Sequence, residues 1–515
     1  MQSVSYKIEK FTDTFIGNIA VTVLSSAMLI MSSAGFGFSW LVFIAFVPFL
    51  YVLSLPAARP VMTGWLLGFL YWVVSLSWMT VTFGYFGGAP AAAAIALLLF
   101  VAVSGGFLFF VPFSFVASRN RNPLLLAMVF VALEGAKGKL FFGGVPWLNL
   151  AQSQHENITV LQFVSVFGEY GLSFMIMALN VYISNFLIGL RKGGLSDNTQ
   201  ARRDLAAIAV IIVITITPGV YKKFNASGFE TEKNIAVIQP AYNQEIKWDP
   251  AKRMDIIRTI NSMAASVNNG GTDLIVLPES SYPASVLDSP PILDYLKKVS
   301  ETTPVIFGTD RRITGDNGTF LYNSMVLMDK GDIQIYDKRH LTPFGEYFPF
   351  EKLLEPVKNF FFGPGAMFTA GTEAAVLESG NMKIAPLICF ESAFSRMPEY
   401  SIKNGANLIV IISNDTWFGK NQGKRQHLAV DTLRAAEYGK TVIRATQDGI
   451  SAVIAPNGSI LRIAEEPVPS IITANITLND NKTVYYYAGN IWIAFVMALI
   501  YYSERKRKRN KNGAQ

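Results

Sequence analysis

The chain has 515 residues, of which 51% are hydrophobic and only 16% are charged, and its formal net charge is +7. A soluble protein of this length carries charges on about a quarter of its residues, so the composition excludes an ordinary soluble globular protein. Part of the positive charge lies in a basic run at 505–509, directly after an apolar segment. This position favours the cytoplasmic flank of a membrane span over a nucleic-acid-binding tail.

Eight apolar segments approach the length of about 20 residues that a helix needs to cross a bilayer. The weakest of them is interrupted by Glu134, Lys137 and Lys139. We therefore predict about eight transmembrane helices, seven of them within residues 1–221. The predicted spans lie near 14–32, 39–56, 61–83, 90–117, 123–140, 158–190, 204–220 and 484–502.

The distribution of Lys and Arg predicts the orientation of these spans. Alternating eight crossings places every short loop rich in Lys and Arg, together with the basic tail, on one side, as the positive-inside rule requires of the cytoplasm. The first apolar segment is interpreted as an anchor rather than a cleaved signal peptide, because its apolar core is long. The large segment 222–482 is therefore expected to face outward, into a periplasm-like space.

Residues 222–482 have the pattern of an α/β domain. Short apolar runs alternate with segments of helical pattern at 250–267, 290–301, 392–403 and 426–438. The dipeptides Lys330-Gly331 and Asn457-Gly458 predict two hairpins. Alternating helices and strands with added hairpins predict a layered domain with mixed sheets. The expected strands lie at 235–238, 274–277, 305–307, 324–328, 333–336, 384–388, 408–412, 452–454 and 471–476.

Three reactive side chains follow predicted strands directly. Glu279, Lys338 and the only cysteine, Cys389, each come just after an apolar run. With no second cysteine the chain can form no internal disulfide, so the thiol is free. Strand ends of such a domain meet at one edge of the sheet. A carboxylate base, a cation for an oxyanion and a thiol nucleophile together supply the groups that acyl transfer requires.

The surroundings of these residues resemble the Glu-Lys-Cys triad of the nitrilase superfamily, which implies an αββα sandwich. Further segments resemble, more closely, the apolipoprotein N-acyltransferases of Gram-negative bacteria, and this resemblance covers nearly the whole chain. Soluble nitrilases carry the triad without the membrane spans. The segments are 338–349, 413–419, Gln426-His427, Gln239-Pro240 with Lys247-Trp248, and 144–147.

The resemblance implies an activity and a location. Members of this family move the sn-1 acyl chain of a phospholipid, usually phosphatidylethanolamine, onto the cysteine as a thioester. They then pass it to the α-amine of the diacylglyceryl-cysteine of an apolipoprotein. It also implies a protein of the bacterial inner membrane, with spans over 1–221, a periplasmic catalytic domain over 222–482 and a last span and basic tail over 483–515. No cofactor is expected, and the three histidines lack the spacing of metal ligands.

The same resemblance assigns roles to further residues. Glu346 corresponds to a second essential acid and Glu391 to a supporting one, although Glu391 is also interpreted as a group that holds the cysteine loop by hydrogen bonds. Phe390 departs from the family pattern, in which a tyrosine often follows the cysteine. The tryptophans are equally interpreted as anchors at the membrane interface. The residues expected to bind substrate are Trp147, Trp248, Phe390, Trp417 and Phe418.

Two other interpretations compete with the transferase. A membrane-tethered amidase that hydrolyses carbon–nitrogen bonds would use the same triad, so only the membrane spans and the second acid, Glu346, favour the transferase. A transporter or scaffold with an inert domain is disfavoured because all three triad positions are intact.

Overall fold

The computed structural model describes residues 11–512 except 87, 89, 141–142, 194, 196–197, 225–230, 317 and 351–366. The chain divides into two units, and each is described by itself. The first comprises Met1–Ser77, Ile95–Asn225 and Tyr487–Gln515, and the second comprises Trp78–Ala94 and Ala226–Tyr486. The second unit therefore contains a segment from the region of the predicted spans.

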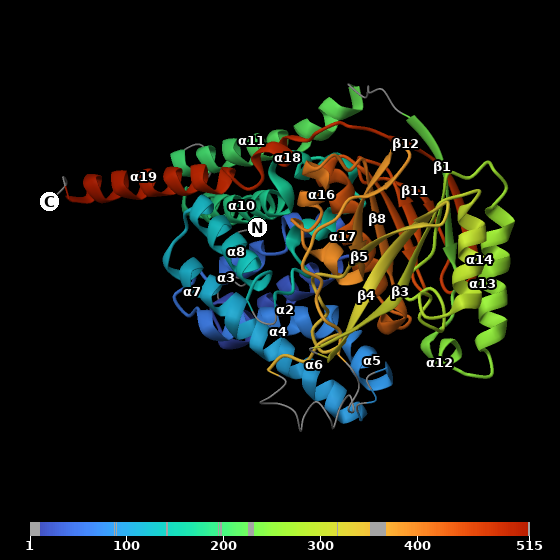
Figure 1. Ribbon diagram of the computed structural model, residues 1–515. Helices are drawn as coiled ribbons and strands as arrows, with labels where there is room; N and C mark the ends of the chain where they lie inside the picture. The colour runs from blue at the N-terminus through green and yellow to red at the C-terminus, as the bar shows by residue number, and fades with distance from the viewer. Residues whose placement is uncertain are drawn as a thin grey trace. The chain divides into compact units, whose positions relative to one another are not determined.

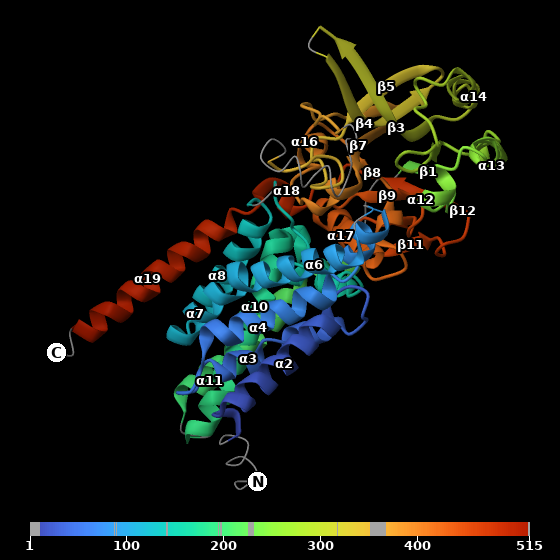
Figure 2. The ribbon, with the colours of Figure 1, turned by 90° about the horizontal axis from the view of Figure 1, so that it is seen from below.

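The first unit is helical. Among its long helices, α2 packs against α4 and α8 packs against α10 (Figure 2). Helix α10 contains one non-helical position at Gly168, where φ is +69°. The helices are α2 (Phe15–Ser32), η1 (Ser39–Phe43), α3 (Val47–Val52), α4 (Pro60–Ser75), α6 (Ala91–Gly105, which begins in the second unit), η3 (Gly106–Phe110), α7 (Val111–Arg119), α8 (Pro123–Lys137), η4 (Leu150–Gln154), α9 (Ile158–Leu161), α10 (Val164–Gly193), α11 (Thr199–Phe224) and α19 (Trp492–Asn512).

Within the described residues, four helical segments are long and apolar enough to cross a membrane. They are Phe15–Ser32, Ala91–Arg119, Val164–Arg191 and Thr199–Lys222. Shorter apolar helices at Ser39–Val52, Pro60–Ser75 and Trp492–Tyr502 coincide with three more of the predicted spans. The prediction of a membrane protein agrees with these helices, whereas the count of about eight spans stays a prediction.

The second unit is built around two six-stranded sheets, with strand orders β12-β1-β2-β3-β4-β5 and β11-β10-β9-β8-β7-β6 (Figure 1). Both sheets are mixed. Strands β1, β2 and β3 are parallel, as are β7, β8 and β9, and the other neighbouring strands pair antiparallel. The strands are β1 (Thr231–Gln239), β2 (Leu274–Val276), β3 (Val305–Gly315), β4 (Gly318–Asp329), β5 (Asp332–Asp337), β6 (Leu377–Ser379), β7 (Met382–Ile388), β8 (Leu408–Ser413), β9 (Thr441–Thr446), β10 (Ala452–Ile454), β11 (Ile460–Ile463) and β12 (Ser470–Leu478).

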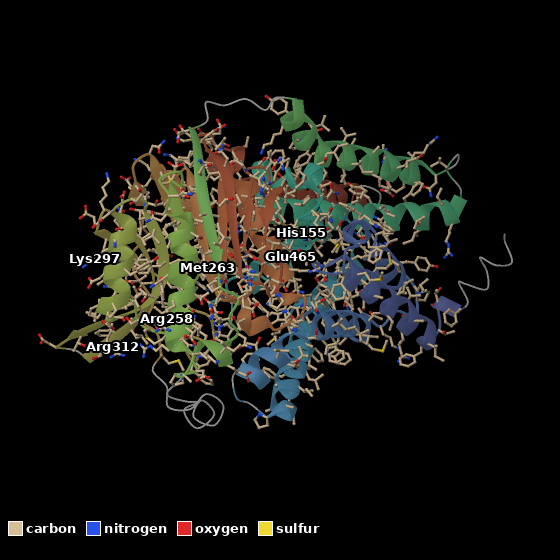
Figure 3. All side chains as sticks on the ribbon, turned by 90° about the vertical axis from the view of Figure 1, so that its right-hand side faces the viewer. His155, Arg258, Met263, Lys297, Arg312 and Glu465 are labelled. Carbon is tan, nitrogen blue, oxygen red and sulfur yellow. The ribbon has the colours of Figure 1, made fainter. Side chains whose placement is uncertain are left out.

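Helices cover the outer face of each sheet. Helices α13 and α14 pack on the first sheet, and α16 and α17 pack on the second. Figure 3 shows the outer helices of the first sheet, with Arg258 and Met263 on α13 and Lys297 on α14. The helices are α5 (Met79–Val81), η2 (Thr82–Phe86), α12 (Gln244–Lys247), α13 (Arg253–Val267), α14 (Pro290–Ser300), η5 (Cys389–Ala393), α16 (Glu399–Lys403), η6 (Asp415–Phe418), α17 (Gly423–Tyr438) and α18 (Val484–Ala488).

The apolar runs of the central strands follow from this αββα layering. Along β8, Leu408, Val410 and Ile412 join the core between the sheets, while Ile409 and Ile411 join the core under α16 and α17. Successive side chains of a strand point to opposite faces, so a strand covered on both faces is apolar throughout. The predicted layered α/β domain is confirmed.

Most predicted elements of this unit are present, and one helix is shorter than expected. The Lys330-Gly331 hairpin joins β4 to β5 with both residues at positive φ, as a tight primed turn requires. The helical pattern at 392–403 yields a helix only from Glu399. Cys389–Ala393 form instead a 3₁₀ turn whose hydrogen bonds involve Glu391.

A buried glutamine links the two sheets. The side-chain oxygen of Gln239, at the end of β1, accepts hydrogen bonds from Ser451 N (3.0 Å) and Thr446 Oγ1 (3.2 Å). Its amide nitrogen donates to the carbonyl oxygens of Glu465 (3.0 Å) and Val468 (3.2 Å). The side chain is fully buried, so these partners have little access to water.

We expect Gln239→Leu to lower the stability of the protein by on the order of 2 kcal/mol or more, because it leaves buried main-chain groups without partners. Thermal unfolding of the detergent-solubilised protein measures the loss. Gln244→Leu is the matched control, since Gln244 is less buried and bonds an exposed tryptophan. Equal midpoints for the two variants would contradict the proposed link.

Candidate active site

The structure brings the ends of three strands together. Glu279 follows β2, Lys338 follows β5 and Cys389 follows β7. Lys338 Nζ lies 3.8 Å from Glu279 Oε1, and the charges of Glu279 and Lys338 both act on the Cys389 thiol. The three residues that the sequence singled out therefore share one site, and their catalytic roles remain a prediction.

The lysine lies between two carboxylates. Its Nζ is 2.7 Å from Glu346 Oε2 and donates a longer bond of 3.4 Å to Thr342 Oγ1. Asn323, on β4, joins the two acids by donating to Glu279 Oε1 (2.6 Å) and to Glu346 Oε1 (2.7 Å). All four of Glu279, Asn323, Lys338 and Glu346 are buried, so the cluster is a polar network enclosed by the protein.

Electrostatics assign different protonation behaviour to the two acids. Burial alone lowers the pKa of Lys338, but Glu346 and Glu279 outweigh it and hold that pKa well above its usual range. Burial raises the pKa of Glu346, yet the lysine reverses the shift and the net pKa is lowered. For Glu279, burial and the charge of Glu346 prevail over Lys338, and its pKa is raised. Glu279 is thus the acid of this pair that exchanges a proton more readily.

The cysteine occupies a constrained loop. Cys389 is half-buried, has φ +52° and begins the 3₁₀ turn η5. Burial and the charge of Glu279 raise the pKa of its thiol, and Lys338 opposes them. The thiol is consequently protonated at neutral pH and needs a base to become a nucleophile.

Glu391 ties this loop to the lysine loop. Its fully buried carboxylate accepts hydrogen bonds from Ile388 N (2.8 Å), Arg339 N (2.8 Å) and His340 N (3.1 Å). The hydroxyl of Tyr336 donates to it as well, at 2.8 Å. Burial raises the pKa of Glu391. These contacts match the interpretation of Glu391 as the group that holds the cysteine loop.

Three of the predicted binding residues follow the ends of the adjacent strands β7 and β8. Phe390 packs edge-on against Phe394, with ring centroids 5.2 Å apart. Trp417 and Phe418 belong to η6, which leaves β8 beside the end of β7. The Trp417 side chain is 40% exposed, and the Phe418 ring meets Trp78 edge-on with centroids 4.7 Å apart.

The other two predicted binding tryptophans have different settings. Trp248 follows α12 and is 53% exposed. The preceding Lys247 is buried and bonds the carbonyl oxygen of Ser280, next to Glu279. Trp147 belongs to the first unit, where it is buried and its carbonyl oxygen accepts a 2.6 Å bond from Lys137. Contact of either tryptophan with substrate stays a prediction.

The sequence did not single out Asn323 or the contacts of the segment 78–94. Asn323 precedes Ser324, which pairs with Asp337 across β4 and β5, so strand register places it beside Lys338. Correct pairing of the two strands would have revealed it. The contacts of Trp78 carried no signal in the sequence, because they join residues more than 300 positions apart.

Fold and site together define a domain of the nitrilase superfamily, and residues 234–486 match the carbon-nitrogen hydrolase family. Residues 25–182 match the apolipoprotein N-acyltransferase N-terminal domain family. The chain belongs to the apolipoprotein N-acyltransferase family, as its sequence pattern predicted.

The chain is similar to curated relatives over most of its length. An apolipoprotein N-acyltransferase of Pseudomonas syringae pv. tomato is 31% identical over 417 residues, which are 77% of this chain and 78% of the relative. One of Geobacter metallireducens is 27% identical over 92% of both chains. An amidase of Nesterenkonia AN1 from the nitrilase superfamily aligns with a TM-score of 0.36 and 19% identity over 47% of this chain and 90% of its own.

We expect Glu346→Gln to move the acidic limb of the pH–rate profile for acylation of Cys389 to lower pH. The acidic limb is expected to move to lower pH for two reasons. The substitution removes the negative charge that raises the pKa of Glu279, and it leaves Lys338 free to stabilise the Glu279 carboxylate. A lower pKa keeps the Glu279 carboxylate ionised, and thus able to accept a proton, at more acidic pH.

Mass spectrometry of the acyl adduct at a series of pH values measures this limb. Glu378→Gln is the control, because Glu378 is exposed and pairs with Lys383 on the surface. A limb that stays in place, or that moves to higher pH, would contradict the assignment of an ionised Glu346.

Proposed function

We propose that this protein is an acyltransferase of the bacterial inner membrane that completes the lipid modification of lipoproteins. It takes an acyl chain from the sn-1 position of a phospholipid, phosphatidylethanolamine being the proposed donor, and passes it to the terminal amine of a diacylglyceryl-cysteine. The observation that carries the proposal is a buried lysine held by two carboxylates beside the only thiol, in a chain of this family.

In the first half-reaction, Glu279 accepts the proton of the Cys389 thiol. The thiolate attacks the ester carbonyl, and the Lys338 ammonium stabilises the oxyanion that forms. As the tetrahedral intermediate collapses, the bond to the glycerol oxygen breaks and that oxygen takes the proton from Glu279. A lysophospholipid leaves and a thioester remains.

In the second half-reaction, the amine of the lipoprotein attacks the thioester. Glu279 removes the proton that the nitrogen loses, Lys338 again stabilises the oxyanion, and the carbon–sulfur bond breaks to give an amide. The thiolate then regains its proton from Glu279. Glu346 keeps Lys338 charged and oriented, and Asn323 holds Glu279 and Glu346 by donating a hydrogen bond to each carboxylate.

The proposed surroundings of the reaction are apolar. Phe390, Trp417 and Phe418 border the cysteine, and Trp248 and Trp147 are proposed to contact the lipid chains. We further propose that residues 1–221 contribute seven spans and residues 483–515 the eighth, with residues 222–482 facing the periplasm. Both substrates are lipid-anchored, so a site held at the membrane surface suits them.

We expect Lys338→Met to slow thioester formation by on the order of 10²-fold or more, because an oxyanion donor of this kind has at least that effect. Intact-protein mass spectrometry after incubation with phospholipid measures the adduct. Lys440→Met is a matched control, since Lys440 is also buried but bonds the carbonyl oxygens of Asn479 and Asn481. A wild-type rate in Lys338→Met would remove the lysine from the mechanism.

We expect the two half-reactions to be separable. Labelled phospholipid alone should give a hydroxylamine-sensitive adduct on Cys389, and a diacylglyceryl-cysteinyl peptide should discharge it into an amide. Cys389→Ala should form no adduct, and Cys389→Ser should be nearly inactive, because a hydroxyl is far harder to deprotonate than a thiol. Release of free fatty acid at the same rate with and without the peptide would show a hydrolase instead.

A further inference from the structure

A second buried polar cluster lies beneath the cysteine and has no role in the scheme above. Arg444, on β9, is fully buried and pairs with Asp415 and Asp431. Burial raises the pKa of Asp415, but Arg444 and then His427 reverse the shift, and the pKa is held well below its usual range. Asp415 is therefore a carboxylate, able only to accept hydrogen bonds.

His427 connects this cluster to the cysteine backbone. Its Nδ1 lies 2.9 Å from Asp415 Oδ1, and its Nε2 lies 3.2 Å from the carbonyl oxygen of Cys389 and 3.2 Å from Ser392 Oγ. A carboxylate and a carbonyl oxygen both act as acceptors only. The proton of the contact with Cys389 therefore lies on Nε2, while Nδ1 faces Asp415 Oδ1 and, at 3.2 Å, Arg444 Nη2.

The backbone that His427 contacts is strained. At φ +52°, Cys389 occupies the left-handed region, which a residue with a Cβ rarely adopts and which persists only where neighbours enforce it. Glu391 bonds the main-chain nitrogen of Ile388 on one side of the cysteine. His427 bonds the carbonyl oxygen on the other side. The first contact holds the peptide group that precedes Ile388, and the second holds the peptide group that joins Cys389 to Phe390.

Ser413 extends the cluster to the thiol itself. Its hydroxyl donates to Asp415 Oδ1 at 2.6 Å and also hydrogen-bonds the Cys389 thiol. The cluster thus contacts the cysteine at its carbonyl and at its sulfur. The charged groups that act on the thiol are Glu279, Lys338 and Asp415, and the thiol in turn acts on Arg444.

We propose that His427, held by Asp415 and Arg444, is a positioning residue for the nucleophile, which orients Cys389 by donating a hydrogen bond to its carbonyl oxygen. The inference is independent of the acyl donor and acceptor. It concerns the presentation of the thiol, whatever electrophile the thiol meets.

The test compares His427→Ala and His427→Gln in the full-length protein in detergent, after hydroxylamine has removed any adduct. The side-chain amide of glutamine retains an N–H donor near the position of Nε2, whereas alanine retains none. The first readout is the rate of Cys389 alkylation by iodoacetamide across the neutral and alkaline pH range, which needs no lipid. The second is thioester formation from phospholipid, and the thermal midpoint reports on folding.

We expect His427→Ala to slow thioester formation by on the order of tenfold to a hundredfold, because the carbonyl oxygen of Cys389 loses its hydrogen-bond donor. The dependence of its alkylation rate on pH should also change, either in the limiting rate or in the pH of the midpoint. His427→Gln should recover most of the rate. Lys440→Met, which disturbs the same domain without touching the cysteine loop, should leave the alkylation profile unchanged even where its thermal midpoint falls.

Two results would overturn the proposal. One is an alkylation profile and a thioester rate of His427→Ala equal to those of the wild type. The other is an equal loss of rate in His427→Ala and His427→Gln at equal thermal midpoints, since the donor would then be irrelevant. The two proposals can fail separately, because alkylation involves no lipid. If the His427 variants change alkylation as expected but the wild-type protein transfers no acyl chain, the proposed function is refuted and this inference stands.

Discussion

The site depends on one constraint, a lysine ammonium enclosed by protein. A buried charge without a partner costs several kcal/mol, and removing one member of a buried ion pair is strongly destabilising. Lys338 therefore requires acids within reach, and the structure supplies Glu346 at 2.7 Å and Glu279 at 3.8 Å. The acid at the shorter distance has a lowered pKa, whereas the pKa of the more distant acid, Glu279, is raised.

The two sheets make this arrangement possible. Glu279 and Lys338 come from the first sheet, and Cys389 comes from the second. A site assembled across a sandwich is only as well defined as the packing between its layers. Gln239 and Glu391 both bridge elements of the two sheets through buried hydrogen bonds, so the polar contacts between the layers and the geometry of the site are coupled.

The fold class and the gathering of the three reactive residues could be predicted from local sequence, whereas other contacts of the site could not. Strand-length apolar runs followed by Glu279, Lys338 and Cys389 sufficed to predict the fold class and the gathering of these residues, because strand ends meet at sheet edges. Asn323 escaped, and His427 was noted only within a family-like segment and without a role, since each acquires its contacts through tertiary pairing with residues distant in the sequence.

In the first unit, too, local sequence did not predict where helices are interrupted or which polar contacts they make. The apolar stretch at 158–190 was predicted as one span, but the chain leaves the helix between α9 and α10 and again at Gly168. Glu134 and Lys137 weakened the prediction of a span at 123–140. In the structure they bond the main chain of Leu150 and Trp147, which hydropathy cannot foresee.

The grouping of Trp78–Ala94 with the sandwich has a consequence for biosynthesis. The catalytic unit is discontinuous, so its first piece leaves the ribosome more than 130 residues before the second begins. Trp78 bonds Gln426 and packs on Phe418, and Phe83 packs on Phe344. Residues 226–486 excised alone would expose these aromatic rings to water, so the sandwich is an incomplete folding unit without the piece that precedes it.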